Sequence, residues 1–299
     1  MQQTLQQKGM MLASIGVLIL SFDAMLIRLS GVSSWDVVFW RGWLICLVFT
    51  TLTLLKRQRI QWPNNRAHWL LAALIAALYG INTLLFVFSI SNTSTANTVV
   101  ILASSPLFAA IFSRLFLHEP IKHRVLLAII ASFIGVITIF AGSFNSGGWQ
   151  GDIAALCLAL FMGIVLTLVR RYSGLPLLPI IALSGAVAGL MAIPLASPMS
   201  LPANSYLWLA IMGLVQMPLA TWLLMQAPRF IPSAEVSLFL LIETILGPVW
   251  VWLAVGEETP ARTLLGGTII LSAIFANTMA ALYEQKQKQK QKQKCKSAN

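Results

Sequence analysis

Charged residues are scarce in this sequence of 299 residues. Only 10% of them are Asp, Glu, Lys or Arg, whereas soluble globular domains contain about 25%. Hydrophobic residues make up 58% of the chain, and the mean hydropathy is +0.82. A buried soluble core does not account for so large a deficit of charge. The composition therefore excludes a soluble globular domain and predicts an integral membrane protein.

Cysteine and histidine are also rare, with three of each. Cys46 and Cys157 fall inside apolar runs and Cys295 lies near the C-terminus, so we expect no disulfide framework. The sequence contains no Walker loop, no Cys or His spacing typical of a metal site, and no G-x-S-x-G motif. We therefore expect neither an enzyme nor an ATP-driven pump, and no cofactor or metal.

Basic residues exceed acidic ones by 11, but their positions do not form a nucleic-acid-binding face. Six lysines lie in the last 14 residues. Gln and Lys alternate from Gln285 to Lys294, a low-complexity pattern that predicts a disordered tail. This tail either contacts anionic lipids or is simply the solvated, positively charged end of the chain. We expect no nucleic-acid partner.

Ten apolar runs are long enough to cross a bilayer, which takes about 20 residues. They are numbered here as spans 1 to 10 and cover residues 10–28, 36–55, 68–90, 95–116, 123–141, 151–169, 175–195, 205–226, 233–254 and 262–283. The predicted organisation is a cytoplasmic N-terminus (1–9), a first half (10–141), an external linker (142–150), a second half (151–283) and a basic cytoplasmic tail (284–299). The short loops leave no room for a soluble domain.

The basic residues occur in alternate loops, and this alternation predicts the orientation of the chain. Lys56, Arg57, Arg59 and Arg66 lie between spans 2 and 3, and Arg170 and Arg171 follow span 6, whereas the loops after spans 3, 5 and 7 are nearly free of charge. Short loops rich in Lys and Arg stay on the cytoplasmic side. Both termini should therefore be cytoplasmic, and we expect the protein in a bacterial inner membrane.

The two halves of the sequence show a weak internal repeat. A shift of 138 residues places "STANTVVILASSPLFAAIFSRLFLHEP", which begins at Ser94, on "PSAEVSLFLLIETILGPVWVWLAVGEE", which begins at Pro232. Both segments have a small-residue start, a proline in mid-span and an acidic residue after the end. A repeat of five spans enters the membrane from the opposite side in its second copy. Inverted repeats of this kind are typical of secondary transporters, whose substrate site lies near the midplane between the repeats.

These segments, together with "FWRGW" around Arg41 and "PRFIPSAEVSLFLLIETILGPVWVWLAVGE" in spans 8 and 9, resemble the drug/metabolite transporter superfamily, specifically its EamA-type ten-helix exporters. The resemblance covers about residues 10–283. It implies an all-α membrane protein of two inverted five-helix repeats around a central cavity, with spans 5 and 10 away from the pore. It also implies export or exchange of small metabolites, with amino acid exporters of the YddG type among the relatives. Many members have a proline directly after the span 9 glutamate, where this chain has Thr244.

Ionisable residues inside a predicted span are costly when unpaired, and four of them stand out. Asp23 and Arg41 lie at matching depth, about 7 Å below the outer face of adjacent antiparallel helices, so we predict an ion pair. This pair is either a static clamp or an outer gate that binds a substrate carboxylate. Glu243 is central, with no basic residue expected at its depth, and is either a proton-coupling group that binds a substrate ammonium or a neutral carboxyl that joins helices. Glu235, near the cytoplasmic end, is a secondary acid that the helix dipole also explains.

Uncharged polar and aromatic residues complete the predicted substrate site. The candidates, each of which can equally be an interhelix contact, are Tyr79, Asn82, Asn97, Ser104, Gln216 and Trp222. Gly80, Pro106, Pro218 and the Gly247–Pro248 pair are expected to bend or break helices near them and free backbone groups to line a cavity.

The sequence leaves three functions open. The first is a secondary transporter for small polar or zwitterionic metabolites, amino acids above all. The second is a lipid-carrier flippase or another membrane protein without transport activity, although no catalytic pair is evident. The third is an exporter of cationic drugs, which the absence of a glutamate from span 1 disfavours. We expect a monomer.

Overall fold

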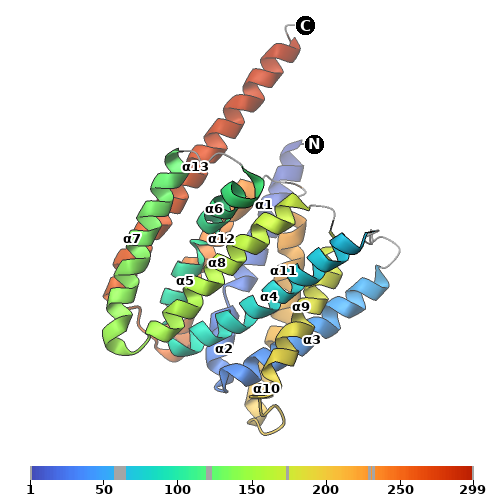
Figure 1. Cartoon of the computed structure of the whole chain (residues 1–299), viewed down its shortest axis with the longest axis vertical. Coiled ribbons are helices and arrows are strands. Elements are labelled where there is room, and N and C mark those ends of the chain that lie inside the picture. Colours follow the sequence, from blue (N-terminus) through green and yellow to red (C-terminus); the bar gives the residue numbers. More distant parts are fainter. Residues whose placement is uncertain are drawn as a thin grey trace.

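The computed structural model describes residues 2–56, 65–118, 123–172, 175–227, 230 and 233–297, and throughout these ranges the regular structure is helical. Its helices form one bundle in which several are strongly inclined to the others, and the N- and C-termini emerge at the same end (Figure 1). In chain order they are α1 (Gln2–Leu20), α2 (Asp23–Ser30), α3 (Ser34–Leu55), α4 (Arg66–Asn92), α5 (Thr95–Leu102), α6 (Ser105–Leu117), α7 (His123–Ser146), α8 (Trp149–Arg171), α9 (Leu177–Ala192), α10 (Ala203–Ala210), the π-helical segment η2 (Ile211–Gln216), α11 (Met217–Gln226), α12 (Ser233–Val255) and α13 (Ala261–Ser297).

The predicted fold class is confirmed: this is an all-α integral membrane protein whose ten spans form two five-helix repeats. Within the described residues, eight helical stretches are long and apolar enough to cross a membrane, and the apolar segments Leu177–Ala192 and Phe239–Val255 are shorter. Span 1 consists of α1 and α2, span 4 of α5 and α6, and span 8 of α10, η2 and α11. The other seven spans are single helices.

The packing of the spans follows the repeat. Span 1 packs against spans 8 and 9, and span 6, its counterpart, packs against spans 3 and 4. Span 2 packs against its own counterpart, span 7, and span 5 against span 10. Exchanging the two halves therefore maps these contacts onto one another, as two related repeats require. The pair α7 and α13 lies at one edge of the bundle (Figure 1), in agreement with the expectation that spans 5 and 10 lie to one side.

Glycines allow close contact between the helices of two crossings, that of span 2 with span 7 and that of span 5 with span 10. A Cβ atom on Gly42 of α3 would lie 2.6 Å from the backbone nitrogen of Gly189 and 2.7 Å from the carbonyl oxygen of Gly185, both in α9. At the other crossing, a Cβ on Gly135 of α7 would lie 2.7 Å from the carbonyl oxygen of Gly266 in α13. Apolar side chains give helices in lipid little reason to associate, so such small-residue contacts contribute much of the interhelical packing.

Three spans are interrupted inside the membrane. Span 4 breaks at Ala103–Ser104, directly before Pro106, which occupies the first turn of α6; this interruption was predicted. Span 8 contains η2 immediately before Pro218, because proline cannot donate the usual backbone hydrogen bond and its ring crowds the preceding turn. Span 1 breaks at Ser21–Phe22, which no proline or glycine in the sequence announces.

Neither Gly80 nor the Gly247–Pro248 pair breaks its helix: Gly80 lies within the continuous helix α4, and the pair lies within the continuous helix α12. The alternative, a bend at these residues, stays a prediction. Gly80 instead serves close packing, because a Cβ there would lie 2.8 Å from the Val187 side chain of α9.

The two ends of the second half also differ from the prediction. The external linker is only residues 147–148, because α7 continues to Ser146 and α8 begins at Trp149. The tail, predicted to be disordered, continues α13 as helix to Ser297. Gln and Lys are good helix formers, and a tail that extends an existing helix needs no new nucleation.

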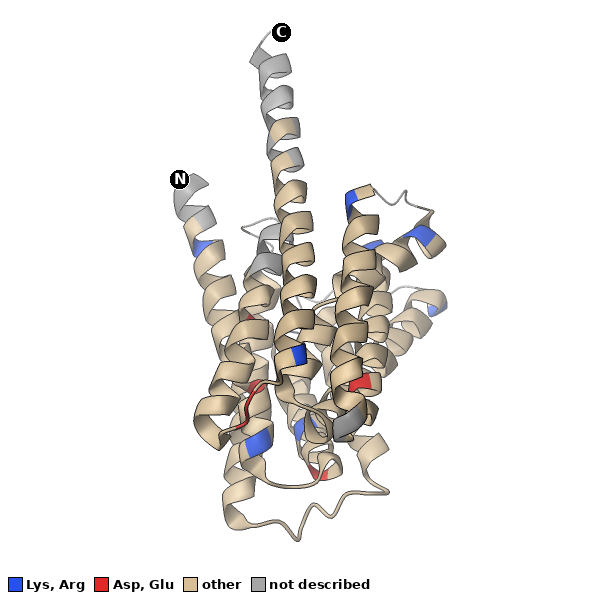
Figure 2. Ribbon diagram, turned by 90° about the vertical axis from the view of Figure 1, so that its left-hand side faces the viewer, with Lys and Arg blue, Asp and Glu red and all other residues tan. Residues whose placement is uncertain are grey.

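Charge is distributed unequally between the two ends of the bundle. Basic residues occur at several helix ends near the two termini and also in the other half, where the described acidic residues lie (Figure 2). Arg114, Arg170 and Arg171 are in the last turns of helices that end on the side of the termini, and Asp36 and Asp152 are in the first turns of helices that begin on the opposite side. This asymmetry accords with the predicted cytoplasmic termini.

Candidate functional site

An ion pair lies in the interior of the bundle between spans 1 and 2. Nη1 of Arg41 is 2.9 Å from each carboxylate oxygen of Asp23. Both side chains are about 5% exposed. The break in span 1 places Asp23 in the first turn of α2, where the helix dipole favours a negative charge. The predicted contact between the two residues is therefore present, and its role in gating or binding stays a prediction.

The other donors of Arg41 lack strong acceptors. Nη1 and Nη2 contact the sulfur atoms of Met212 and Met217 at 3.8 and 3.5 Å, and the guanidinium carbon lies 5.6 Å from the centre of the Phe86 ring. The buried Nε atom has no hydrogen-bond partner. Methionine sulfur is a weak acceptor, so the guanidinium retains capacity for a carboxylate ligand.

Glu243 belongs to the same charged cluster. Its carboxyl group interacts electrostatically with both Asp23 and Arg41, and its residue is partly exposed. The expectation that no basic residue lies near it is wrong. Glu243 thus adds a second carboxyl group within electrostatic range of the Asp23–Arg41 pair.

Two buried amides on neighbouring spans have unused hydrogen-bonding capacity. Gln216, at the end of η2, donates from Nε2 to the carbonyl oxygens of Ile19 and Leu20 at 3.1 and 3.4 Å, which caps the interrupted end of α1, while its buried Oε1 has no partner. Asn82 is 3% exposed, and neither atom of its amide has a partner. Asn82 lies one turn before Phe86, on the same face of α4, and Phe86 is the residue whose ring Arg41 covers.

Trp250 of α12 contacts the break in span 1. Nε1 of Trp250 donates to the hydroxyl of Ser21 at 2.9 Å, and the Trp250 ring stacks on Phe22 with centroids 4.9 Å apart. Ser21 and Phe22 form the break itself. An aromatic pair beside the charged cluster is suited to an amphipathic solute or an organic cation.

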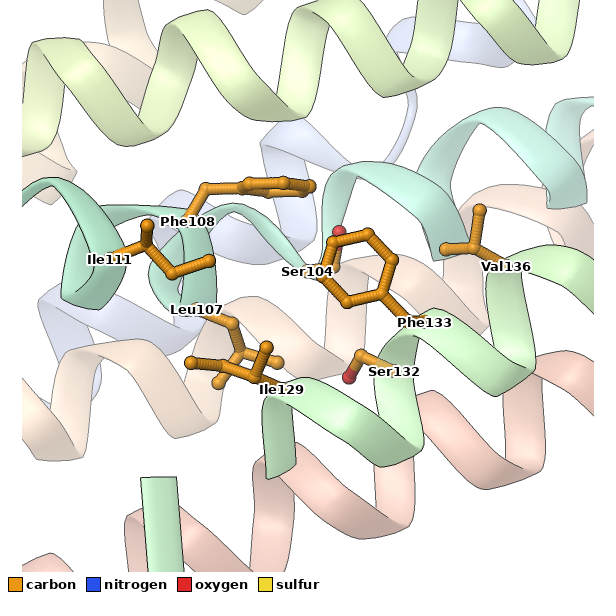
Figure 3. A pocket seen from close by; sticks show the side chains of 8 residues that line it. All are labelled: Ser104, Leu107, Phe108, Ile111, Ile129, Ser132, Phe133 and Val136. Atoms are coloured by element: carbon orange, nitrogen blue, oxygen red, sulfur yellow. The ribbon is translucent and has the colours of Figure 1, made fainter. Parts of the chain in front are cut away.

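Ser104 does not face this cluster. Its hydroxyl donates to the carbonyl oxygen of Ile101 at 2.6 Å. The side chain borders a cleft between α6 and α7 whose other lining is largely apolar, with Ser132 and Phe133 on the opposite side (Figure 3). The free volume of this cleft is about 10 Å³, which is the space of one water molecule. The cleft is therefore too small for a metabolite.

Tyr79 and Trp222 also lie outside the cluster. Tyr79 packs on an apolar group formed by α4, α8 and α9, including Ile75 and Val165. Trp222 is 36% exposed, and the ammonium of Lys56 lies 5.8 Å from its ring centre, so it is near the end of the bundle that carries the termini. Glu235 is in the first turn of α12, and its side chain lies outside the described part of the structure.

Asn97, another predicted substrate ligand, has all its capacity used by protein partners. Its Nδ2 donates to the hydroxyls of Thr93 and Ser143 and to Oδ1 of Asp152, at 3.1, 2.7 and 2.9 Å, and its Oδ1 accepts from Thr263. This network joins α5 to α7, α8 and α13, so Asn97 connects the two repeats. Asp152 is fully buried. The sequence analysis does not select Asp152, because it lies at the very start of span 6, where a charged residue is expected near the membrane surface.

A polar cavity of about 410 Å³ opens at the end of the bundle opposite the termini. Its lining residues are Arg28, Ser91, Asn92, Thr93, Ser94, Asn97, Ser143, Gly147, Gly148, Glu257 and Pro260. Arg28 and Glu257 form an ion pair of 2.8 Å at its wall. The cavity is separate from the Asp23–Arg41 cluster and was not predicted as a site.

Comparison with known proteins agrees with the repeat and with the membrane fold. The model of the EamA-like transporter family matches residues 7–141 and, a second time, residues 149–279. The chain belongs to this family. The two matches coincide with the two halves identified from helix count and charge. The chain is also 23% identical over 240 residues to the uncharacterized transporter YdfC of Bacillus subtilis (strain 168), covering 78% of this chain and 77% of that protein.

Two further relatives add to this comparison. An uncharacterized transporter of Clostridium kluyveri (strain ATCC 8527 / DSM 555 / NBRC 12016 / NCIMB 10680 / K1) is 25% identical over 256 residues, covering 81% of each chain. A solved crystal structure of a protein superposes with a TM-score of 0.60 at 15% identity over 92% of this chain and 99% of that one. The likeness at this identity shows the fold alone. Family and relatives thus identify a transporter-type membrane protein and name no substrate.

Proposed function

We propose that this protein is a secondary transporter that exports small polar or zwitterionic metabolites, with amino acids as the main substrate class, across the bacterial inner membrane by alternating access. The observation that carries the proposal is the buried Asp23–Arg41 ion pair at the break in span 1, with the partly exposed Glu243 in electrostatic range of both residues. Buried charges inside a membrane are expensive and typically mark substrate or ion pathways. A zwitterion needs groups of both signs within a few ångströms, and this cluster supplies them.

The proposed mode of substrate binding uses the polar atoms of the cluster that lack a hydrogen-bond partner. A substrate carboxylate accepts from Arg41, whose Nε has no partner and whose Nη2 faces a sulfur atom. The substrate ammonium donates to the carboxyl group of Glu243, and the free amide of Asn82 and Oε1 of Gln216 add hydrogen bonds. Asp23 then competes with the substrate for the guanidinium, so binding loosens the contact between spans 1 and 2.

The repeat supplies the conformational change. Spans 1, 8 and 9 pack together, as do spans 3, 4 and 6, and relative movement of two such groups alternately opens a site between them in transporters with inverted repeats. The proposed orientation has both termini in the cytoplasm, and the helical extension of α13 brings its lysines to anionic lipid headgroups. Each monomer contains a complete cluster, so we propose that the monomer transports.

An exporter of organic cations is the second candidate, and one observation favours it. The cluster has two carboxyl groups and one guanidinium, so its net charge is negative when all three are ionised, and the Phe22–Trp250 stack lies beside it. Aromatic faces and a negative charge together suit a hydrophobic cation. No comparable observation favours a lipid-carrier flippase. Lipid movement is one of the possible results of the experiment below.

Counterflow into proteoliposomes distinguishes these functions. The purified chain is reconstituted, the vesicles are preloaded with one unlabelled solute at a time, and entry of the same radiolabelled solute is measured for the amino acids, for tetraphenylphosphonium and for a fluorescent phospholipid. We expect counterflow of at least one amino acid, absent from protein-free vesicles and strongly reduced by Arg41→Gln. Counterflow of tetraphenylphosphonium alone supports the cation exporter, and lipid movement alone contradicts both transport proposals.

A further inference from the structure

The polar cavity at the external end has the dimensions and chemistry of a second binding site. Its volume of about 410 Å³ falls within the range of small-molecule sites, about 300–1,000 Å³. Hydroxyl, amide and backbone groups of the turn between spans 3 and 4 line one side, and Arg28 and Glu257 line another. The cavity therefore offers a cation, an anion and neutral hydrogen-bonding groups in one place.

The Arg28–Glu257 ion pair also fastens this end of the bundle. Nη2 of Arg28 donates to the carbonyl oxygen of Thr93 at 2.9 Å, and Oε1 of Glu257 accepts from the backbone N–H of Thr95 at 2.6 Å. Arg28 belongs to span 1 and Glu257 follows span 9, whereas Thr93 and Thr95 join spans 3 and 4. The pair thus belongs to the group of spans 1, 8 and 9. It forms hydrogen bonds with both sides of the turn between spans 3 and 4, which belongs to the other group.

This contact joins segments of two interrupted spans, span 1 and span 4. α2 and α5, which end next to the contact, are separated from the inner halves of their spans by the breaks at Ser21–Phe22 and Ala103–Ser104. The ion pair is accessible, since the two side chains are 26% and 23% exposed, and the buried Nε of Arg28 has no partner. A solute in the cavity can therefore reach both charges.

We propose that this cavity is an external binding site for a small zwitterion, and that the Arg28–Glu257 pair is a latch with which the solute competes. The carboxylate of the solute accepts from the guanidinium of Arg28, and its ammonium donates to Glu257, which releases Thr93 and Thr95. Occupancy of the cavity then loosens the contact between the two groups of spans at the outer end. The proposal rests on the proposed function, because it assigns the same substrate class to a second, peripheral site.

Protection of an introduced thiol tests the site without reference to membrane orientation. Cys46, Cys157 and Cys295 are replaced by serine, and Asn92→Cys is introduced at the cavity wall or Met199→Cys at an exposed position outside it. The rate of modification by a methanethiosulfonate reagent is measured on the full chain in detergent micelles. The probe is a mixture of glycine, L-alanine, L-serine and L-threonine, compared with lactate and with ethylamine, each of which carries only one of the two charges.

We expect the amino acid mixture to slow modification at Asn92→Cys and not at Met199→Cys, and lactate or ethylamine alone to protect little. Arg28→Gln or Glu257→Gln should abolish protection and raise the rate without probe by about threefold, as expected for a partly exposed ion pair. Glu258→Gln, which removes the neighbouring exposed carboxylate, is the matched control and should change neither. Size-exclusion chromatography of each variant confirms that it is folded.

Three results would overturn the proposal: no protection by the mixture, equal protection in Arg28→Gln, or loss of protection in Glu243→Gln, which would place the bound solute at the central cluster. Counterflow measured on the same variants separates the two proposals. Transport without protection would contradict the external binding site and support the transport function. Protection without transport would support the external binding site and contradict the transport function.

Discussion

Replacing Asp23 by asparagine should destabilise the protein more than any other single change in the charged cluster. The substitution leaves the guanidinium of Arg41 buried, with its side chain about 5% exposed. It keeps its contacts with two methionine sulfurs and the Phe86 ring and its electrostatic interaction with Glu243, but it loses its ion-pair partner. An arginine cannot lose its proton in a protein, so the charge persists. Removing one partner of a buried pair costs about 3–5 kcal/mol, and we expect Asp23→Asn to fall in this range.

Arg41→Gln should cost less, about 1–3 kcal/mol, because the Asp23 carboxyl that it leaves behind can take up a proton. The double variant, Asp23→Asn with Arg41→Gln, leaves no unpaired charge from this pair and should be more stable than the sum of the single effects predicts, by about 2 kcal/mol or more. The free energy of unfolding is measured by equilibrium unfolding in mixed detergent micelles, with the exposed Glu258→Gln as a control that changes it by less than about 0.5 kcal/mol. Single effects that add to within about 0.5 kcal/mol would show that the pair contributes no coupling.

Three further predictions concern packing, topology and the tail. Gly42→Ala should destabilise the fold by about 1–3 kcal/mol, because its Cβ would meet the α9 backbone at 2.6 Å, whereas Gly247→Ala, with no neighbour nearer than 3.8 Å, should be tolerated; equal thermal stability of the two variants would refute this view of the crossing. Single cysteines introduced at Asn145 and Asn299 should be labelled from opposite sides of intact membranes, since five spans separate them, and labelling from one side would contradict the inverted repeat. Deletion of residues 285–299 should leave counterflow unchanged, because this helical extension projects away from the bundle (Figure 1); a loss of transport in neutral-lipid vesicles would assign the tail a direct role.

The spans and their arrangement could be predicted from sequence because lipid imposes strong rules. Backbone groups in a bilayer must be satisfied within the helix, so a run of apolar residues such as 68–90 has one outcome, and α4 occupies 66–92. The break in span 4 was foreseeable from Pro106, since the effect of proline is local. The break at Ser21–Phe22 was not, because it depends on contacts made 195 and more residues away, by Gln216 and Trp250.

The candidate site was predictable in its charges and less so in its polar residues. Asp23, Arg41 and Glu243 could be selected because an ionisable residue inside a membrane span is energetically costly and usually has a functional or pairing role. Asn97 could not be distinguished from Asn82 by sequence, because both are amides in the interior of adjacent spans. The difference is that Asn97 meets Asp152 and three hydroxyls, whereas the buried amide of Asn82 has no hydrogen-bond partner, and this depends on the packing of distant helices.

Glu243 gives the most direct test of the account as a whole. Counterflow of the best amino acid substrate is measured between pH 5 and 8 for the wild-type chain and for Glu243→Gln, which keeps the shape of the side chain and removes its titration. The account predicts that the wild-type rate varies with pH and that the variant, folded to the same extent, transports at about a tenth of the rate or less, with no pH dependence. A variant that transports like the wild type at every pH would show that Glu243 only joins helices, and the proposed binding site would have to be abandoned.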